Sequence, residues 1–315
     1  PSHLPKRVDT AGKRVIHHTS ASAMTAPAQT SLAAFSLPAP AKLNLFLHIT
    51  GRRADGYHTL QTLFQFLDHG DTLHFMRRAD QQIVLQGQLP GVNVEDNLIA
   101  RAARALQAAT GCVLGASIEL DKRLPMGGGL GGGSSDAATT LLGLNALWQT
   151  QLSLSELASI GLKLGADVPV FIHGHAAWAE GVGEQLQSVD IDEPWYVVLT
   201  PDAHIATAAA FSHPELTRNS DPITLRAFSA GAARNDFEKV VRQLSPAVDA
   251  ALQWLAQHGN ARMTGTGACV FLACPDAGHA ARILAASPVQ GFISRGQNVS
   301  PAHRALDTLF RPHRI

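Results

Sequence analysis

The sequence has few charges and no long apolar run, and each absence excludes a class of protein. Only 16% of its residues are charged and its formal net charge is zero, so it lacks the basic surface that nucleic-acid-binding proteins use. No apolar run reaches the ~18 residues that a membrane-spanning helix needs. We therefore expect neither a nucleic acid nor a membrane as partner.

Cysteine and clustered histidine are also scarce. The three cysteines include no C-x-x-C pair, and their odd number indicates reduced thiols in a cytosol-like compartment rather than disulfides or zinc. The fifteen histidines are scattered: His17 and His18 are adjacent and His173 and His175 are two apart, which is not the i, i+4 spacing of a helical metal pair. The sequence therefore identifies no metal ligands, and it gives no signal for an oligomeric state.

The first 36 residues lack the apolar periodicity of a folded segment. They hold four basic residues and one acid among many alanines, serines and threonines, which predicts a disordered extension over 1–36. A plastid transit peptide has a similar composition. We favour a bacterial cytoplasmic protein with a dispensable tail, because Met24 lies inside this stretch as an alternative start.

The most informative stretch is a glycine loop that leads into a helix. Residues 125–138 read PMGGGLGGGSSDAA, with six glycines in seven positions. Glycines let a ligand approach the main chain, and a following helix adds free N–H groups and a positive dipole end. Ser134 or Ser135 is expected to cap this helix, whose apolar residues recur at helical spacing. A flexible linker would have polar flanks without periodicity, so the pattern predicts a phosphate-binding loop.

Two common phosphate motifs do not fit this loop. Gly127, Gly129 and Gly132 satisfy G-x-G-x-x-G only because nearly every residue here is glycine, and residues 121–125 separate them from the strand expected at 116–120. No G-x-x-x-x-G-K-[ST] sequence occurs anywhere in the chain, which excludes a P-loop.

Beyond residue 36 the pattern alternates between strands and helices in two blocks, which predicts an α+β fold. A chain of 315 residues that is 45% hydrophobic is large enough for two domains, and a break at 190–194 places them at 37–190 and 191–315. In the strand expected at 43–49, the apolar residues at alternate positions should share one face. The other expected strands and helices are strands at 59–67, 71–75, 82–85, 195–200, 264–273 and 291–294, and helices at 97–109 (capped by Asn97), from the capping box Ser153–Glu156 to Gly165, and at 278–286.

The glycine loop resembles the nucleotide loop of the GHMP kinases, the small-molecule kinases named for galactokinase, homoserine kinase, mevalonate kinase and phosphomevalonate kinase. Two further stretches agree with that family in order and spacing: PAPAKLN at 38–44 and MTGTGAC at 263–269. Residues 41–61 resemble the branch that acts on a cytidine diphosphate conjugate of methylerythritol, in the non-mevalonate route to isoprenoid precursors. The resemblance implies a ribosomal-S5-like first domain, a ferredoxin-like second domain and an active site in the cleft between them.

By this resemblance, the chain is an ATP-dependent kinase that uses Mg²⁺ and phosphorylates an alcohol of a small molecule. Asp167 aligns with the family's catalytic carboxylate, although the context G-A-D-V-P alone is equally typical of a turn or N-cap aspartate. Lys42 is implied to lie beside Asp167, where its charge stabilises the carboxylate and the transferred phosphoryl group. A solvated charge on an edge strand is the alternative for this lysine.

The resemblance also implies the residues that hold the two substrates. Tyr57 and Phe211 would sandwich a cytosine ring while His58 binds its edge, but core packing is the alternative for both aromatic rings. The full set of implied binding residues is Pro125, Met126, Gly127, Gly128, Gly129, Leu130, Gly131, Gly132, Gly133, Ser134 and Ser135 for the nucleotide, and Asn44, Tyr57, His58, Thr207, Phe211, Gly265 and Gly267 for the small molecule.

Several points stay open in the sequence. The chain could act on homoserine, mevalonate or a sugar, as other members of the family do, or could be a sensor that binds ATP without transferring phosphate. Ser134 and Ser135 are the nearest hydroxyls to a bound Mg²⁺, but no carboxylate pair identifies its ligands. Asp136 suits a helix N-terminus and would repel a phosphate, so it has no assigned role.

Overall fold

The computed structural model describes residues 33–86, 93, 95–231 and 233–310, which belong to one compact unit. Strands and helices follow one another in mixed order, which confirms the α+β class. In these ranges no helix is long and apolar enough to cross a membrane.

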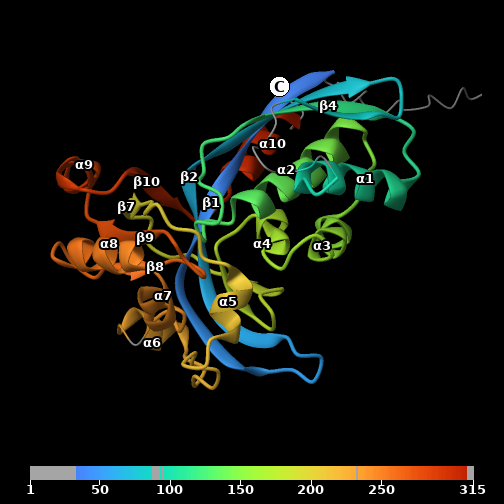
Figure 1. The fold of residues 1–315 in the computed structure, drawn as a ribbon. Coiled ribbons are helices and arrows are strands. Elements are labelled where there is room, and N and C mark those ends of the chain that lie inside the picture. The colour runs from blue at the N-terminus through green and yellow to red at the C-terminus, as the bar shows by residue number, and fades with distance from the viewer. Residues whose placement is uncertain (1–32, 87–92, 94, 232, 311–315) are drawn as a thin grey trace, which may run out of the picture. The chain divides into compact units, whose positions relative to one another are not determined.

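The longest elements are two antiparallel strands, β1 (Ala34–Arg52) and β2 (His58–Arg78), which pair along almost their whole length. Residues 53–57 form the tip of this long hairpin, drawn in blue in Figure 1. The sequence predicts two strands where the structure has the single strand β2. Gly70, which lies between them, does not form a turn. A glycine is needed there because a Cβ would lie 2.3 Å from the carbonyl oxygen of Ala39 on β1.

Register shifts in β1 overturn the prediction that its apolar residues share one face. Leu43 and Leu45 pack in one core cluster, whereas Leu47 and Ile49 pack in another. An irregularity between Asn44 and Leu47 breaks the alternation of side chains. Both faces of β1 are therefore buried at this point, which a single alternating pattern does not describe.

In the described part of the chain, ten strands form one sheet with the order β3-β4-β2-β10-β7-β9-β8. Strands β1 and β5 also pair with β2, and β6 pairs with β5. Strand β10 pairs with β2 through Gly296 and Gln297 and with β7 along five residues, so the two predicted blocks share one sheet. A domain boundary near residue 190 stays a prediction. The remaining strands are β3 (Ile83–Gln86), β4 (Gly115–Asp121), β5 (Ala177–Glu180), β6 (Gln185–Ser188), β7 (Trp195–Leu199), β8 (Arg262–Met263), β9 (Val270–Cys274) and β10 (Gly291–Gln297).

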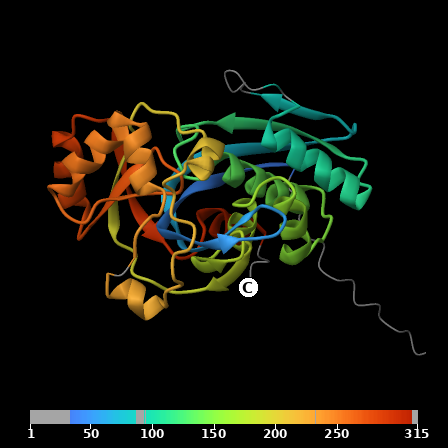
Figure 2. The same cartoon turned by 60° about the horizontal axis from the view of Figure 1, so that its bottom comes forward.

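Most helices lie in two groups on opposite sides of the long hairpin, and in Figure 1 these groups include the helices within residues 98–173 and those within residues 238–286. Figure 2 shows the same arrangement turned by 60°. The first group packs on β1 and β2 around one core cluster, and the second packs on β7, β9 and β10 around another. The first group is α1 (Leu98–Thr110), α2 (Gly132–Leu147), α3 (Leu154–Leu162), α4 (Val168–His173) and α10 (Pro301–Phe310); the second is α7 (Glu238–Leu244), α8 (Pro246–Ala256) and α9 (Ala277–Ala286). Two short helices remain: α5 (Thr207–Ser212) contributes Ala210 to the second cluster, and α6 (Leu225–Ser229) packs its Phe228 ring against Phe46 of β1.

Short capping signals identify two helix starts correctly. The side chain of Asn97 accepts a hydrogen bond from the amide of Ile99 at the start of α1, and Ser153 and Glu156 form the predicted capping box of α3. The end of α3 is wrong in the sequence prediction: the helix ends at Leu162, and Gly165 lies in the turn that follows.

Residues before 37 belong to the fold, which the sequence does not predict. Strand β1 begins at Ala34, and the Phe35 ring packs against Phe75 and Phe310 with centroid distances of 5.5 and 5.2 Å. The predicted disordered extension over 1–36 is therefore wrong for its last residues, because a buried aromatic ring there completes a core. Residues 1–32 of that prediction lie outside the described residues.

Candidate active site

One cavity of about 1040 Å³ brings together the three sequence motifs. Its wall includes β1, the hairpin tip, the glycine loop with the start of α2, the start of α4, and α5 with the loop after β8. Of the predicted site residues, the cavity is lined by 125–134 and by Lys42, Asn44, Tyr57, His58, Asp167, Thr207, Phe211 and Gly265. Ser135 and Gly267 are not among the lining residues, and the Ser135 side chain is fully buried behind the loop.

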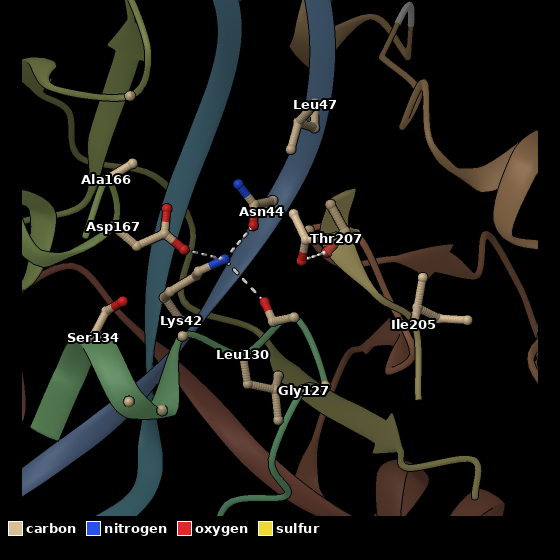
Figure 3. A pocket seen from close by; sticks show the side chains of 18 of the residues that line it. Lys42, Asn44, Leu47, Gly127, Leu130, Ser134, Ala166, Asp167, Ile205 and Thr207 are labelled. Carbon is tan, nitrogen blue, oxygen red and sulfur yellow. Dashed lines mark hydrogen bonds and ion pairs between the residues drawn. The ribbon is translucent and has the colours of Figure 1, made fainter. Parts of the chain in front are cut away.

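Lys42 is the centre of the site. Its side chain is 2% exposed, and its Nζ lies 3.3 Å from Asp167 Oδ2. The ammonium also donates to Asn44 Oδ1 at 2.5 Å and to the carbonyl oxygen of Gly129 at 2.9 Å (Figure 3). The ring of Phe64 lies 5.6 Å from the same nitrogen. These contacts exclude the alternative of a solvated edge-strand charge.

Asp167 faces the cavity from the residue before α4. Its side chain makes no capping hydrogen bond to the helix, although the residue occupies the N-cap position. The carboxylate is 38% exposed and pairs with Lys42 instead, as Figure 3 shows. A turn aspartate would satisfy its own backbone, so the contacts favour a chemical role for this side chain.

The glycine loop is tied down from both sides. The carbonyl oxygen of Gly129 accepts hydrogen bonds from Lys42 Nζ and, at 3.3 Å, from Thr264 Oγ1. Gly129 has φ +76°, and a Cβ there would lie 2.3 Å from the Thr264 carbonyl oxygen, so only glycine fits. The backbone amide of Cys269 also donates to the Gly128 carbonyl at 3.1 Å. The loop therefore contacts the other two motifs directly.

Helix α2 begins at Gly132, at least three residues earlier than a cap at Ser134 or Ser135 would place it. Gly131, with φ +74°, is the residue before the helix, and no side chain caps it. The prediction that Ser134 or Ser135 caps the helix is wrong, because both lie inside its first turns. The first amides of α2 therefore have no capping side chain and lie beside the cavity, which is the arrangement that binds an anion.

Two residues that sequence reasoning missed hold the loop after β8. Thr264 is fully buried, and its Oγ1 accepts a hydrogen bond from the backbone amide of Asn44 at 2.9 Å. The side chain of Asn235 donates to the carbonyl oxygens of Met263 and Gly265 at 2.9 and 2.8 Å. The only sequence signal for Asn235 is its place before the short helix α7, which is too common to indicate a site.

The aromatic residues that line the cavity come from the hairpin and from α5. Tyr57 is 66% exposed at the hairpin tip, so the core alternative is wrong for this ring. His58, not Tyr57, stacks on Phe211 with a centroid distance of 5.0 Å and an interplanar angle of 24°. Phe211 also packs edge-on against Phe237 at 4.8 Å, so its ring both lines the cavity and contacts the core. Thr207, on the same helix as Phe211, lies with its hydroxyl 3.3 Å from that of Thr266.

Electrostatics favour a neutral His58. Burial lowers the pKa of His58, and the charges of Arg218 and Arg52 lower it further. A neutral imidazole has one donor and one acceptor nitrogen, and Nε2 has no partner among the described residues. Depending on the tautomer, Nε2 can therefore act as either a donor or an acceptor toward a ligand.

No group of three or more acidic, histidine or cysteine side chains suited to a metal ion occurs within the described ranges. Ser134 lines the cavity near the loop that leads to Asp167, since a Cβ at Gly165 would lie 3.7 Å from its hydroxyl. One hydroxyl and one carboxylate suit Mg²⁺ that is held mainly by nucleotide phosphates rather than by a protein cage.

Comparison with known proteins identifies two family models that match this chain. The model of the GHMP kinases N-terminal domain matches residues 97–175, and that of the GHMP kinases C-terminal domain matches 213–287. A protein of Chromohalobacter salexigens is 59% identical over 279 residues, which are 86% of this chain and 94% of the relative. One of Pseudomonas aeruginosa PAO1 is 57% identical over 276 residues, which are 87% and 98%. Both are named 4-diphosphocytidyl-2-C-methyl-D-erythritol kinase.

Solved structures agree with the sequence relatives. A crystal structure of 4-(cytidine 5'-diphospho)-2C-methyl-D-erythritol kinase superposes with a TM-score of 0.73 at 32% identity, over 83% of this chain and 99% of that one. The mevalonate kinase of Methanococcus jannaschii has a TM-score of 0.61 at 16% identity, over 86% and 100%, and shows a shared fold. With both domain models matched in order and the kinase motifs meeting in one cavity, the chain belongs to the GHMP kinase family.

Proposed function

We propose that this chain transfers the γ-phosphoryl group of ATP to the 2-hydroxyl of 4-diphosphocytidyl-2-C-methyl-D-erythritol. The main support for this proposal is the Lys42–Asp167 ion pair in the wall of a cavity that the glycine loop and His58 also line. The names of relatives that match over nearly their whole length support the substrate. Their bacterial sources and the free cysteines support a bacterial cytoplasmic enzyme of the non-mevalonate isoprenoid route.

The proposed chemistry is a direct displacement at phosphorus. A bond forms between the substrate oxygen and the γ-phosphorus, the bond from that phosphorus to the bridging oxygen breaks, and ADP leaves. Asp167 accepts the hydroxyl proton, and its partial exposure gives the substrate access to the carboxylate. Lys42 holds this carboxylate in place and adds positive charge near the transferred group, because phosphoryl transfer depends mainly on positioning and charge neutralisation.

Residues 125–134 would hold the nucleotide phosphates with backbone amides at the start of α2. Ser134 and Asp167 would hold a Mg²⁺ ion, which neutralises phosphate charge when it is bound. Ser135, which is buried behind the loop, would support the helix start rather than contact the nucleotide.

The cytidine end would lie among Tyr57, His58, Thr207 and Phe211. A cytosine edge offers an amino donor and a ring acceptor, and one nitrogen of a neutral His58 could bind either of them. Asn44 and Gly265 line the cavity closer to Lys42 and would contact the reacting half of the substrate. The loop that includes Gly267 would support Gly265 from behind.

An assay of ADP release tests the proposal directly. We expect turnover with 4-diphosphocytidyl-2-C-methyl-D-erythritol and little with mevalonate, homoserine or galactose at equal concentration. Preference for one of the last three would identify another activity of the same family. ATP binding without turnover on any of the four would favour a sensor.

A further inference from the structure

A buried carboxylate on β2 contacts the segment that enters the glycine loop. Asp71 is fully buried, and its carboxylate accepts hydrogen bonds from Lys122 Nζ at 2.5 Å, the Arg123 amide at 2.6 Å and the Leu124 amide at 2.8 Å. These three donors come from consecutive residues just before Pro125. One side chain thus fixes the whole segment between β4 and the loop.

The same lysine also reaches the other end of the loop. Lys122 Nζ lies 3.1 Å from Asp136 Oδ2, on the second turn of α2. Lys122 therefore links the residues that enter the loop with the helix that leaves it, and Asp71 attaches both to the sheet. This contact also explains Asp136, whose charge would otherwise oppose a phosphate at the helix start.

The ammonium of Lys122 lies beside Gly132, where the glycine loop leads into α2. Its side chain is 20% exposed and lines the cavity, and a Cβ at Gly132 would lie 3.1 Å from its Nζ. An ion pair this deeply buried is costly to desolvate, so it contributes less to stability than to a fixed arrangement of charge. Burial lowers the pKa of Lys122, but the carboxylates of Asp136 and Asp71 raise it by more than burial lowers it. The net pKa shift is upward, so the lysine is charged.

We propose that Asp71 is a positioning residue for nucleotide binding, which holds Lys122 and the entry of the glycine loop in the geometry that receives the ATP phosphates. The proposal rests on the proposed function only as far as nucleotide binding. It also gives a purpose to the long spacer at 121–125, which a dinucleotide-binding loop does not have.

The test measures affinity for the non-hydrolysable ATP analogue AMP-PNP by calorimetry, without turnover. Asp71→Asn keeps the shape but places an amide against the lysine. We expect it to weaken AMP-PNP binding roughly tenfold, the usual effect of losing one charged hydrogen bond, and to change the KM of the second substrate less than about twofold. The control Asp68→Asn lies on the same strand and contacts Ser294 and Arg295 on β10 instead, so AMP-PNP affinity should not change.

A double variant separates positioning from general support of the fold. If Asp71 acts through Lys122, then Asp71→Asn added to Lys122→Met should weaken AMP-PNP binding less than about twofold beyond Lys122→Met alone. Lys122→Arg, which keeps the charge, should recover most of the affinity. Should Asp71→Asn fail to fold, the two lysine variants decide.

Two results would overturn the proposal. One is normal AMP-PNP affinity in folded Asp71→Asn or in Lys122→Met. The other is an equal loss of affinity for both substrates together with a lower melting temperature, which indicates structural support alone. Neither result depends on which alcohol the enzyme phosphorylates, so the proposed function would be unaffected.

Discussion

Lys42 and Asp167 form an ion pair of 3.3 Å in which the lysine is 2% exposed and the aspartate 38% exposed. The two partners therefore have different surroundings: the ammonium belongs to the cavity wall, whereas the carboxylate faces the space where a substrate would lie. A buried cation with fixed partners is preorganised, and preorganised charge is the main means by which proteins accelerate phosphoryl transfer.

Replacement of the lysine should abolish most activity. Lys42→Met removes the donor to Asn44 Oδ1 and one of the two donors to the Gly129 carbonyl, and it removes the positive charge. We expect kcat to fall roughly 10²–10³-fold, the usual loss for a stabilising group at a reacting centre. Lys163→Met, at an exposed lysine after α3, is the matched control and should have normal kcat. A Lys42→Met variant with wild-type kcat would exclude the proposed electrostatic role.

Thr264 should matter through its hydroxyl alone. Thr264→Val keeps the shape but removes the acceptor of the Asn44 amide and the donor to Gly129. Because both motifs lose a contact, the KM values for ATP and for the second substrate should each rise, roughly tenfold. Thr264→Ser keeps the hydroxyl and should stay close to wild type. Equal KM values in the valine and serine variants would contradict this account.

The two aromatic residues should respond differently to truncation. Tyr57→Ala removes an exposed ring, so it should weaken substrate binding by about 1–3 kcal/mol, the range for one stacked base, and leave the melting temperature unchanged. Phe211→Ala also loses its contacts with His58 and Phe237, so it should weaken binding and lower the melting temperature. Calorimetry and thermal melting distinguish them. Normal substrate affinity in both would remove the rings from the binding site.

The first residues of β1 should contribute to the stability of the fold. Phe35→Ala removes a buried ring that contacts Phe75 and Phe310, and we expect a loss of about 3–5 kcal/mol in the free energy of unfolding. Ser36→Ala is the neighbouring exposed control, which loses only the hydrogen bond between Ser36 Oγ and His74 Nδ1, and it should change this free energy by about 1 kcal/mol or less. Chemical denaturation of both variants measures the difference. An unchanged Phe35→Ala midpoint would support the shorter fold boundary that the sequence predicts.

The sequence predicts the parts of the site that depend on local pattern. A glycine loop before a periodic helix, the Asn97 cap and the Ser153–Glu156 capping box all depend on residues close together in the chain. The structure has all three, although the helix after the loop begins earlier than predicted. The resemblance to a family adds the pairing of Lys42 with Asp167, which no local pattern contains.

What the sequence does not predict depends on contacts between distant residues. Asp71, Asn235 and Thr264 hold loops that are far away along the chain, and an isolated aspartate, asparagine or threonine has no periodicity to reveal such a role. The prediction of one apolar face on β1 is wrong because a bulge reverses the alternation of side chains. The predicted serine cap of α2 is wrong because Gly131, which has no side chain, occupies the N-cap position.

The turnover of Asp167→Asn tests the central claim most directly. The amide keeps the shape of the side chain and removes its charge and basicity, so a residue that accepts the substrate proton cannot be replaced by it. We predict that kcat with 4-diphosphocytidyl-2-C-methyl-D-erythritol falls roughly 10²–10⁴-fold, while circular dichroism stays normal and both substrates still bind. Combined with Lys42→Met, the loss should be smaller than the product of the two single losses, because both groups act on one transition state. Near-normal turnover in folded Asp167→Asn would contradict the proposed role of this carboxylate.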